Sequence, residues 1–142
     1  MRDFAKLVHE DIDAFNVDIV PLTNATKSFD GFTVESIDVV HGTIKPCVGY
    51  ILTKDDVTLG YSGDSGDCPE LRRIYDKSDY IITEATGIEN KGNAHIGLRT
   101  IDPIAKENPE KLFYIVHRGD YETEPTNNLF FPADGEIIEI SK

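Results

Sequence analysis

The chain has 142 residues, of which 14 are basic and 26 are acidic, so its formal net charge is −12. Such a field repels phosphate backbones unless a local basic patch outweighs it, and the densest basic stretch, residues 71–73, lies between Glu70 and Asp76. The composition therefore argues against nucleic-acid binding. The length fits one compact domain, residues 1–142.

Two sequence features concern the cellular location. The N-terminal hexapeptide is too charged for a signal peptide, and no apolar run approaches the ~18 residues that a membrane span requires. We therefore expect a cytoplasmic protein with no membrane partner. Cys47 and Cys68 lack Cys-x-x-Cys spacing, which favours two reduced thiols over a disulfide or a zinc pair.

The N-terminal part is expected to form a helix followed by β structure. Residues 3–15 carry apolar side chains at a spacing of three to four, which predicts an amphipathic helix. Residues rich in β-branched side chains predict strands over 17–22 and 32–40. The polar stretch between these strands contains Asp30-Gly31, which is typical of a hairpin turn.

The middle of the chain predicts a hairpin, a helix and a strand. Segments 48–53 and 57–62 are joined by the polar loop 54–56, so we expect an antiparallel pair. Residues 69–75 suit a short helix with proline near its start, and residues 80–83 suit a short strand.

The last third contains one helix and several strands. Residues 98–106 predict a helix, provided that Pro103 lies in its first turn. Residues 112–116 predict a buried strand, and 130–131 and 137–140 predict two final β segments. Alternation of strands with helices in the central part indicates an α/β layer in which helices cover a sheet.

Four ionisable residues lie at or just past the ends of predicted strands: His41, Asp64, Glu84 and His117. His95 lies in a loop before a predicted helix. Ligands of α/β folds gather beyond the carboxyl ends of strands, and carboxylate and imidazole are ligands that divalent metals favour. Taken singly, each residue is also compatible with a structural or turn role. Together they predict one shared site.

Residues 63–66, Gly-Asp-Ser-Gly, also allow two serine-enzyme interpretations. The serine-protease motif would have glycine where Asp67 stands, and the chain lacks the disulfide-rich character of that class. A lipase-like Gly-Asp-Ser motif would follow the first strand and require a late Asp-x-x-His, which the chain lacks. Both interpretations are therefore set aside.

Several short segments resemble, in order and spacing, motifs of metallo-β-lactamase-fold hydrolases, above all ribonuclease Z and its relatives. The resemblance covers nearly the whole chain. The segments are Tyr-Ser-Gly-Asp-Ser at 61–65, Thr-Glu-Ala-Thr at 83–86, Asn-Ala-His at 93–95, Val-His at 116–117, His41 followed by Gly-Tyr-Ile at 49–51, and Ala-Asp-Gly at 133–135.

The resemblance implies an α/β fold, namely the C-terminal half of an αββα metallo-β-lactamase sandwich with a mixed sheet and flanking helices. It implies that Asp64 bridges two divalent ions, most plausibly zinc, and that His117 ligates one of them. His95 would donate a proton to the leaving group, oriented by Glu84. His41 would be a substrate-binding or structural contact. The implied reaction is ester or phosphodiester hydrolysis by metal-bound hydroxide.

The departures from the family pattern are equally informative. The His-x-His-x-Asp-His motif and the next histidine ligand are absent, so the chain corresponds to a truncated half of the fold. The tRNA-gripping arm of ribonuclease Z is also absent, because only the short loop 54–56 lies at its position. Together with the net charge, this argues against tRNA processing.

Two hypotheses remain open. In the first, the chain is the C-terminal half-site of a metal-dependent hydrolase. In the second, it is a non-catalytic remnant or interaction module without a complete metal centre. On either hypothesis we expect the chain alone to bind zinc weakly and to be inactive, because only Asp64 and His117 match metal ligands. We also expect a partner over the bare inner sheet face, either the missing N-terminal half or a second copy.

Overall fold

The computed structural model describes residues 20–124 and 126–141, so the helix predicted over 3–15 lies outside the described residues. The described elements alternate between strand and helix after the second hairpin, as the sequence predicts for an α/β chain. Their bounds are β1 Thr26–Phe29, β2 Phe32–Asp38, β3 Val48–Lys54, β4 Val57–Tyr61, α2 Pro69–Lys77, β5 Tyr80–Glu84, α3 Leu98–Glu107, β6 Leu112–Val116 and β7 Leu129–Phe130.

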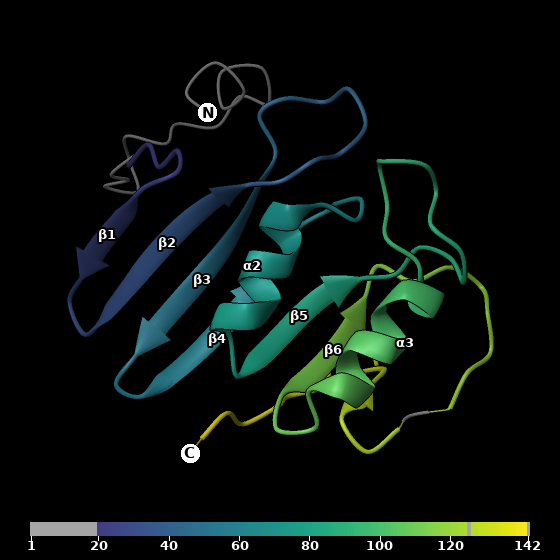
Figure 1. The fold of residues 1–142 in the computed structure, drawn as a ribbon. Coiled ribbons are helices and arrows are strands. Elements are labelled where there is room, and N and C mark those ends of the chain that lie inside the picture. The colour runs from purple at the N-terminus through teal and green to yellow at the C-terminus, as the bar shows by residue number, and fades with distance from the viewer. Residues whose placement is uncertain (1–19, 125, 142) are drawn as a thin grey trace, which may run out of the picture.

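The seven strands form one mixed sheet in the order β1-β2-β3-β4-β5-β6-β7 (Figure 1). Strands β1 to β4 pair antiparallel, and β4 to β7 pair parallel. Both predicted hairpin turns are confirmed, because Phe29 pairs with Phe32 and Lys54 pairs with Val57. The predicted mixed sheet with flanking helices is likewise confirmed.

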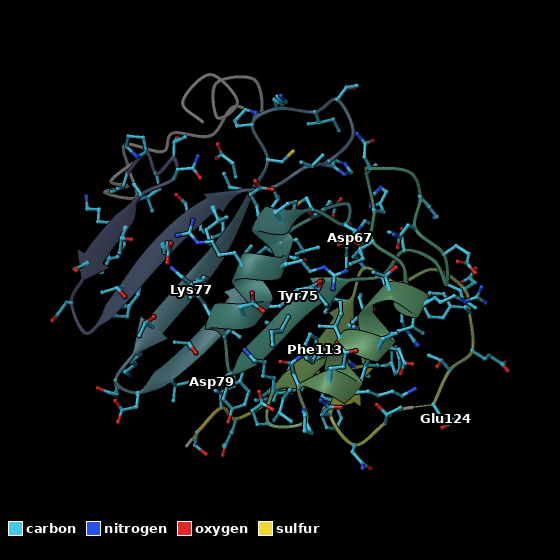
Figure 2. The ribbon with its side chains drawn as sticks, in the orientation of Figure 1. Asp67, Tyr75, Lys77, Asp79, Phe113 and Glu124 are labelled. Carbon is cyan, nitrogen blue, oxygen red and sulfur yellow. The ribbon has the colours of Figure 1, made fainter. Side chains whose placement is uncertain are left out.

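Both helices lie on the same face of the sheet (Figure 1). Helix α2 begins at Pro69 and is capped by Cys68, whose sulfur accepts a hydrogen bond from the Leu71 amide. Tyr75 of α2 and Phe113 of β6 pack edge to face between the layers, with ring centroids 5.6 Å apart (Figure 2). The core on this face is closed by buried apolar side chains: Ile37, Ile51, Leu71, Ile74, Ile81, Ile101, Phe113, Ile115 and Leu129.

The opposite face of the sheet is less densely packed. Because side chains alternate along a strand, Leu59 and Ile82 point away from the helices. They line two separate hollows of about 670 and 580 Å³, and residues 132–141 contribute to the walls of both. The Tyr80 hydroxyl donates a hydrogen bond of 2.5 Å to the Ser141 carbonyl. The inner face that was expected to be bare is therefore partly covered by the chain's own C-terminal segment.

Three predicted strands differ from the structure. Residues 20–22, the described part of the predicted strand 17–22, form no strand, since Pro21 lacks an amide to donate to a ladder. The first strand is instead Thr26–Phe29, within the stretch interpreted as polar. Residues 137–140 lie across the sheet face rather than pairing, and the predicted 130–131 segment is Leu129–Phe130, because the buried residue is Leu129.

Helix α3 is present, but its proline is not where the sequence argument required it. The helix begins at Leu98, which places Pro103 in its second turn rather than its first. Pro103 is exposed, so the helix loses one internal hydrogen bond on its solvent side and keeps its apolar face, with Ile101 and Ala105, buried.

The cysteines and the helix lengths give two further results. Cys47 and Cys68 are both free thiols, as predicted. Within residues 20–124 and 126–141, neither helix has the length and apolar character needed to traverse a lipid bilayer.

Candidate metal and proton-transfer site

The strand directions bring the predicted site residues to one edge of the sheet. Strands β4, β5 and β6 run parallel, and β2 has the same direction because two antiparallel pairings separate it from β4. His41, Asp64, Glu84 and His117 lie at or beyond the carboxyl ends of these strands. His95 joins them from the loop that precedes α3. The structure thus brings all five residues together.

Backbone hydrogen bonds lock the loops that carry these residues. The Gly66 amide donates to the Val40 carbonyl at 2.7 Å, and the Ile96 amide donates to the Ser65 carbonyl at 2.8 Å. The loops approach so closely that a Cβ at Gly66 would lie 2.4 Å from the Asn93 carbonyl oxygen. Only glycine fits there, which explains the residue after Ser65 in structural terms.

The first carboxylate–imidazole pair of the site is buried. The Glu84 side chain is 1% exposed and accepts a hydrogen bond from His95 Nδ1 at 2.8 Å and another from the Ser65 amide at 2.6 Å. Burial raises the pKa of the Glu84 carboxyl, while the Ser65 amide and the His95 ring oppose that rise by stabilising the carboxylate. Glu84 therefore lies behind His95 and orients its ring.

The second carboxylate–imidazole pair is open to solvent. His117 Nδ1 lies 2.9 Å from Asp64 Oδ1, and the two side chains are 54% and 45% exposed. Both residues depend on unusual backbone: Gly63, before Asp64, has φ of 59°, and His117 itself has φ of 45°. A positive φ is uncommon for a residue other than glycine, so the backbone at His117 is constrained by its surroundings.

His41 lies directly against His95 rather than at the periphery of the site. Its Nδ1 donates to the Ala94 carbonyl at 2.8 Å, next to His95 in the chain. The His41 and His95 rings are edge to face at 4.7 Å, and the His95 and His117 rings are 5.9 Å apart. The three imidazoles therefore form one cluster.

The donor atoms suit a divalent transition metal. Two sets each bring three donor atoms within 4.8 Å of one another, the first from His41, Asp64 and His95, the second from Glu84, His95 and His117. Imidazole nitrogen and carboxylate oxygen are among the ligands that zinc takes in proteins. A metal-binding imidazole usually donates a hydrogen bond from its other ring nitrogen, which orients the ring. The donor set fits such an ion.

Sequence reasoning missed the main-chain groups that hold the site. The Ser65 amide binds Glu84, and the Ala94 carbonyl fixes the ring of His41. Neither contact has a residue-type signal, because every residue except proline carries the same amide and carbonyl. The tight Gly-Asp-Ser-Gly segment was the available hint that the backbone there makes close contacts.

Comparison with models of known protein families gives no match, and no curated protein matches the sequence. Solved structures do match. YhfI from Bacillus subtilis, a metallo-β-lactamase-fold protein, is 18% identical with a TM-score of 0.61, over 74% of this chain and 44% of that one. A diphosphatase of the PhnP family is 18% identical with a TM-score of 0.60, over 90% and 45%. The short form of human tRNase Z is 18% identical with a TM-score of 0.52, over 66% and 38%.

At this level of identity the likeness concerns architecture. The matched diphosphatase and tRNase Z act on different substrates, so this architecture does not select one substrate. The chain spans less than half of the length of each of these proteins. The described chain therefore has the metallo-β-lactamase fold, as a part of the full domain found in those structures.

Proposed function

We propose that this chain supplies one half of the active site of a metal-dependent hydrolase that cleaves an ester or a phosphodiester. One observation carries the proposal: two carboxylate–imidazole pairs stand side by side at the strand ends, with the His95 and His117 rings 5.9 Å apart. One pair is suited to proton transfer and the other to ligating metal. With a net charge of −12, nucleic acids are not among the proposed substrates.

The proposed role of each side chain follows from which of its nitrogen or oxygen atoms is not already hydrogen-bonded. The Nδ1–H of His95 donates to Glu84, so Nε2 is the atom that would carry a proton to the leaving group. Glu84 holds the ring in place and stabilises positive charge on it. Asp64 and His117 would hold a divalent ion, for which we propose zinc. When bound, such an ion polarises the scissile bond and lowers the pKa of coordinated water towards ~7.

Two metal ligands do not make a catalytic centre, because a catalytic zinc usually has three protein ligands and water. We propose that a partner carrying the N-terminal half of the fold supplies the rest and packs on the sheet face opposite the helices. The two hollows on that face, of about 580 and 670 Å³, support this placement. The smaller one includes His117 in its lining and so adjoins the site.

Complementation tests the proposal. The full chain, saturated with zinc, is assayed with bis-p-nitrophenyl phosphate alone and after mixing with the N-terminal half of a matched fold, for instance that of YhfI. We expect hydrolysis only after mixing, together with a sedimentation mass of the two halves combined. The matched controls are His95→Gln and Asp64→Asn, each of which should abolish the gain.

Two outcomes would go against the half-site proposal. Full activity of the chain alone would show that its own residues complete the centre. A stable complex without hydrolysis would favour the alternative function, an interaction module that keeps the fold without catalysis. A sedimentation mass of two identical chains would assign the open face to a second copy.

A further inference from the structure

The three described histidines share one hydrogen-bond pattern. In His41, His95 and His117 alike, Nδ1 contacts an acceptor within 2.9 Å: a main-chain carbonyl for the first and carboxylates for the other two. A carbonyl or carboxylate accepts from an imidazole, so Nδ1 carries a hydrogen and Nε2 is the ring nitrogen left to bind metal. Each ring is thus oriented by its Nδ1 contact, as second-shell partners orient metal-ligating histidines.

Of the two donor sets, the one with His41, Asp64 and His95 is the better metal site. The other set requires Glu84, whose carboxylate is 1% exposed and already accepts hydrogen bonds from the Ser65 amide and His95. Recruiting that carboxylate would sacrifice the bonds that orient His95. The Asp64 carboxylate is 45% exposed, and only its Oδ1 atom bonds His117.

The ring geometry supports the same set. The His41 and His95 ring centroids lie 4.7 Å apart and the rings are nearly perpendicular, at 75°. Two imidazoles on one tetrahedral zinc ion have centroids roughly 5 Å apart, because each Zn–N bond is about 2.0–2.1 Å. The two rings therefore already stand at a separation that one ion can bridge.

We propose that this chain, without any partner, binds one divalent transition-metal ion through His41 Nε2, His95 Nε2 and the Asp64 carboxylate. This ligand set differs from the pair Asp64 and His117 in the proposed hydrolase. It rests on the proposed function in one respect, namely that His95 is the proton donor. With a third donor the isolated chain should be metal-loaded, which replaces the expectation of weak zinc binding drawn from Asp64 and His117 alone. It should be inactive, because an ion on His95 Nε2 occupies the atom needed for proton transfer.

A metal titration of the full chain tests this inference without an activity assay. The chain, stripped by a chelator, is titrated with Co²⁺ while visible absorption is recorded, and with Zn²⁺ by calorimetry. We expect one ion per chain. His41→Gln should weaken binding by more than the 10–100-fold typical of losing an outer hydrogen-bond partner, because it removes a ligand.

The matched control is His117→Gln, which removes a histidine of the same cluster but no ligand of the proposed site. It should weaken binding by no more than about 10–100-fold, since it loses only a hydrogen bond to the ligand Asp64. Circular dichroism confirms that each variant folds, and the zinc-induced rise in Tm gives a second reading of the binding constant. If His117→Gln abolishes binding while His41→Gln has no effect, the ion sits on Asp64 and His117 and the inference is overturned.

The metal titration and the complementation assay can fail independently of each other. A His41-dependent site in a chain that never hydrolyses substrate on mixing supports this inference and removes the half-site hydrolase. Hydrolysis on mixing supports the half-site hydrolase. If His41→Gln then leaves the metal affinity of the isolated chain unchanged, the inferred site is overturned.

Discussion

The two carboxylate–imidazole pairs of the site have the same chemistry and nearly the same length, but different surroundings. Glu84 and His95 are joined at 2.8 Å with exposures of 1% and 21%, whereas Asp64 and His117 are joined at 2.9 Å with exposures of 45% and 54%. The first pair belongs to the interior and the second to the rim. Burial, rather than bond length, therefore distinguishes the two pairs.

The energetic reason lies in desolvation. A buried carboxylate is stable only with its hydrogen-bond partners, so Glu84 is tied to both His95 and the Ser65 amide. An exposed pair gains about 0–1 kcal/mol and exchanges its partners with water at little cost. The interior pair can therefore fix a ring in place, and the rim pair of Asp64 and His117 can give up its hydrogen bond to an ion.

The largest expected effect comes from removing the interior carboxylate. Glu84→Ala leaves the Ser65 amide and His95 Nδ1–H without an acceptor in a buried site, so we expect a loss of about 3–5 kcal/mol in the free energy of unfolding. Urea denaturation in the presence of a chelator measures it. Glu84→Gln, which retains an acceptor oxygen, should lose less. A loss below about 1 kcal/mol for the alanine variant would mean that the buried pair stabilises the fold no more than an exposed pair does.

A second buried hydrogen bond, of 2.7 Å, joins the Tyr75 and Thr83 hydroxyls next to Glu84 in the chain. It should make the free energy of unfolding fall at high pH. Burial raises the pKa of Tyr75, and the hydrogen bond to Thr83 opposes the rise only in part. The unfolded chain loses this proton near the ordinary value of about 10, while the folded chain keeps it. The stabilising contribution is therefore complete below pH 10 and is lost as the pH rises further.

Tyr75→Phe tests that dependence. At pH 7–8 the variant should lose about 0.5–1.5 kcal/mol, because the Thr83 hydroxyl loses its partner. Above pH 10 its stability should fall less steeply with pH than that of the wild type, by at most about 1.4 kcal/mol per pH unit. Urea denaturation from pH 8 to 11.5 gives both slopes, and the slopes at pH 8 should agree. Identical alkaline slopes would show that Tyr75 does not contribute.

The sequence predicted which residues meet at the site better than it predicted how they are held. Parallel strands end at a common edge, so the positions of Asp64, Glu84 and His117 after apolar runs were sufficient to place them together. His95 was also predicted to join them, from its position in the loop before a helix. The family resemblance added the role of His95 as proton donor, with Glu84 behind its ring.

The rest depended on contacts with no local signal. The proposed role of His41 as a metal ligand rests on the Ala94 carbonyl, which accepts a hydrogen bond from His41 Nδ1 and which only the folded loops bring near. The segment 137–140 alternates like a strand, yet it packs across the sheet face. The same apolar pattern fits a segment that packs on a sheet face and a strand that pairs within the sheet. Periodicity alone therefore cannot distinguish these two placements.

The smallest expected effect on stability comes from the rim pair, and it completes the comparison. Asp64→Asn keeps an oxygen that can accept the hydrogen bond from His117 and removes one exposed charge from a chain of net charge −12. We expect a change within about 1 kcal/mol in the free energy of unfolding, measured in urea with a chelator present. The same variant should lose metal binding, because both proposed ligand sets include the Asp64 carboxylate. A fall in stability as large as that of Glu84→Ala would show that the rim pair also supports the fold. The difference in exposure would then no longer separate the pair that holds the site together from the pair that binds the ion.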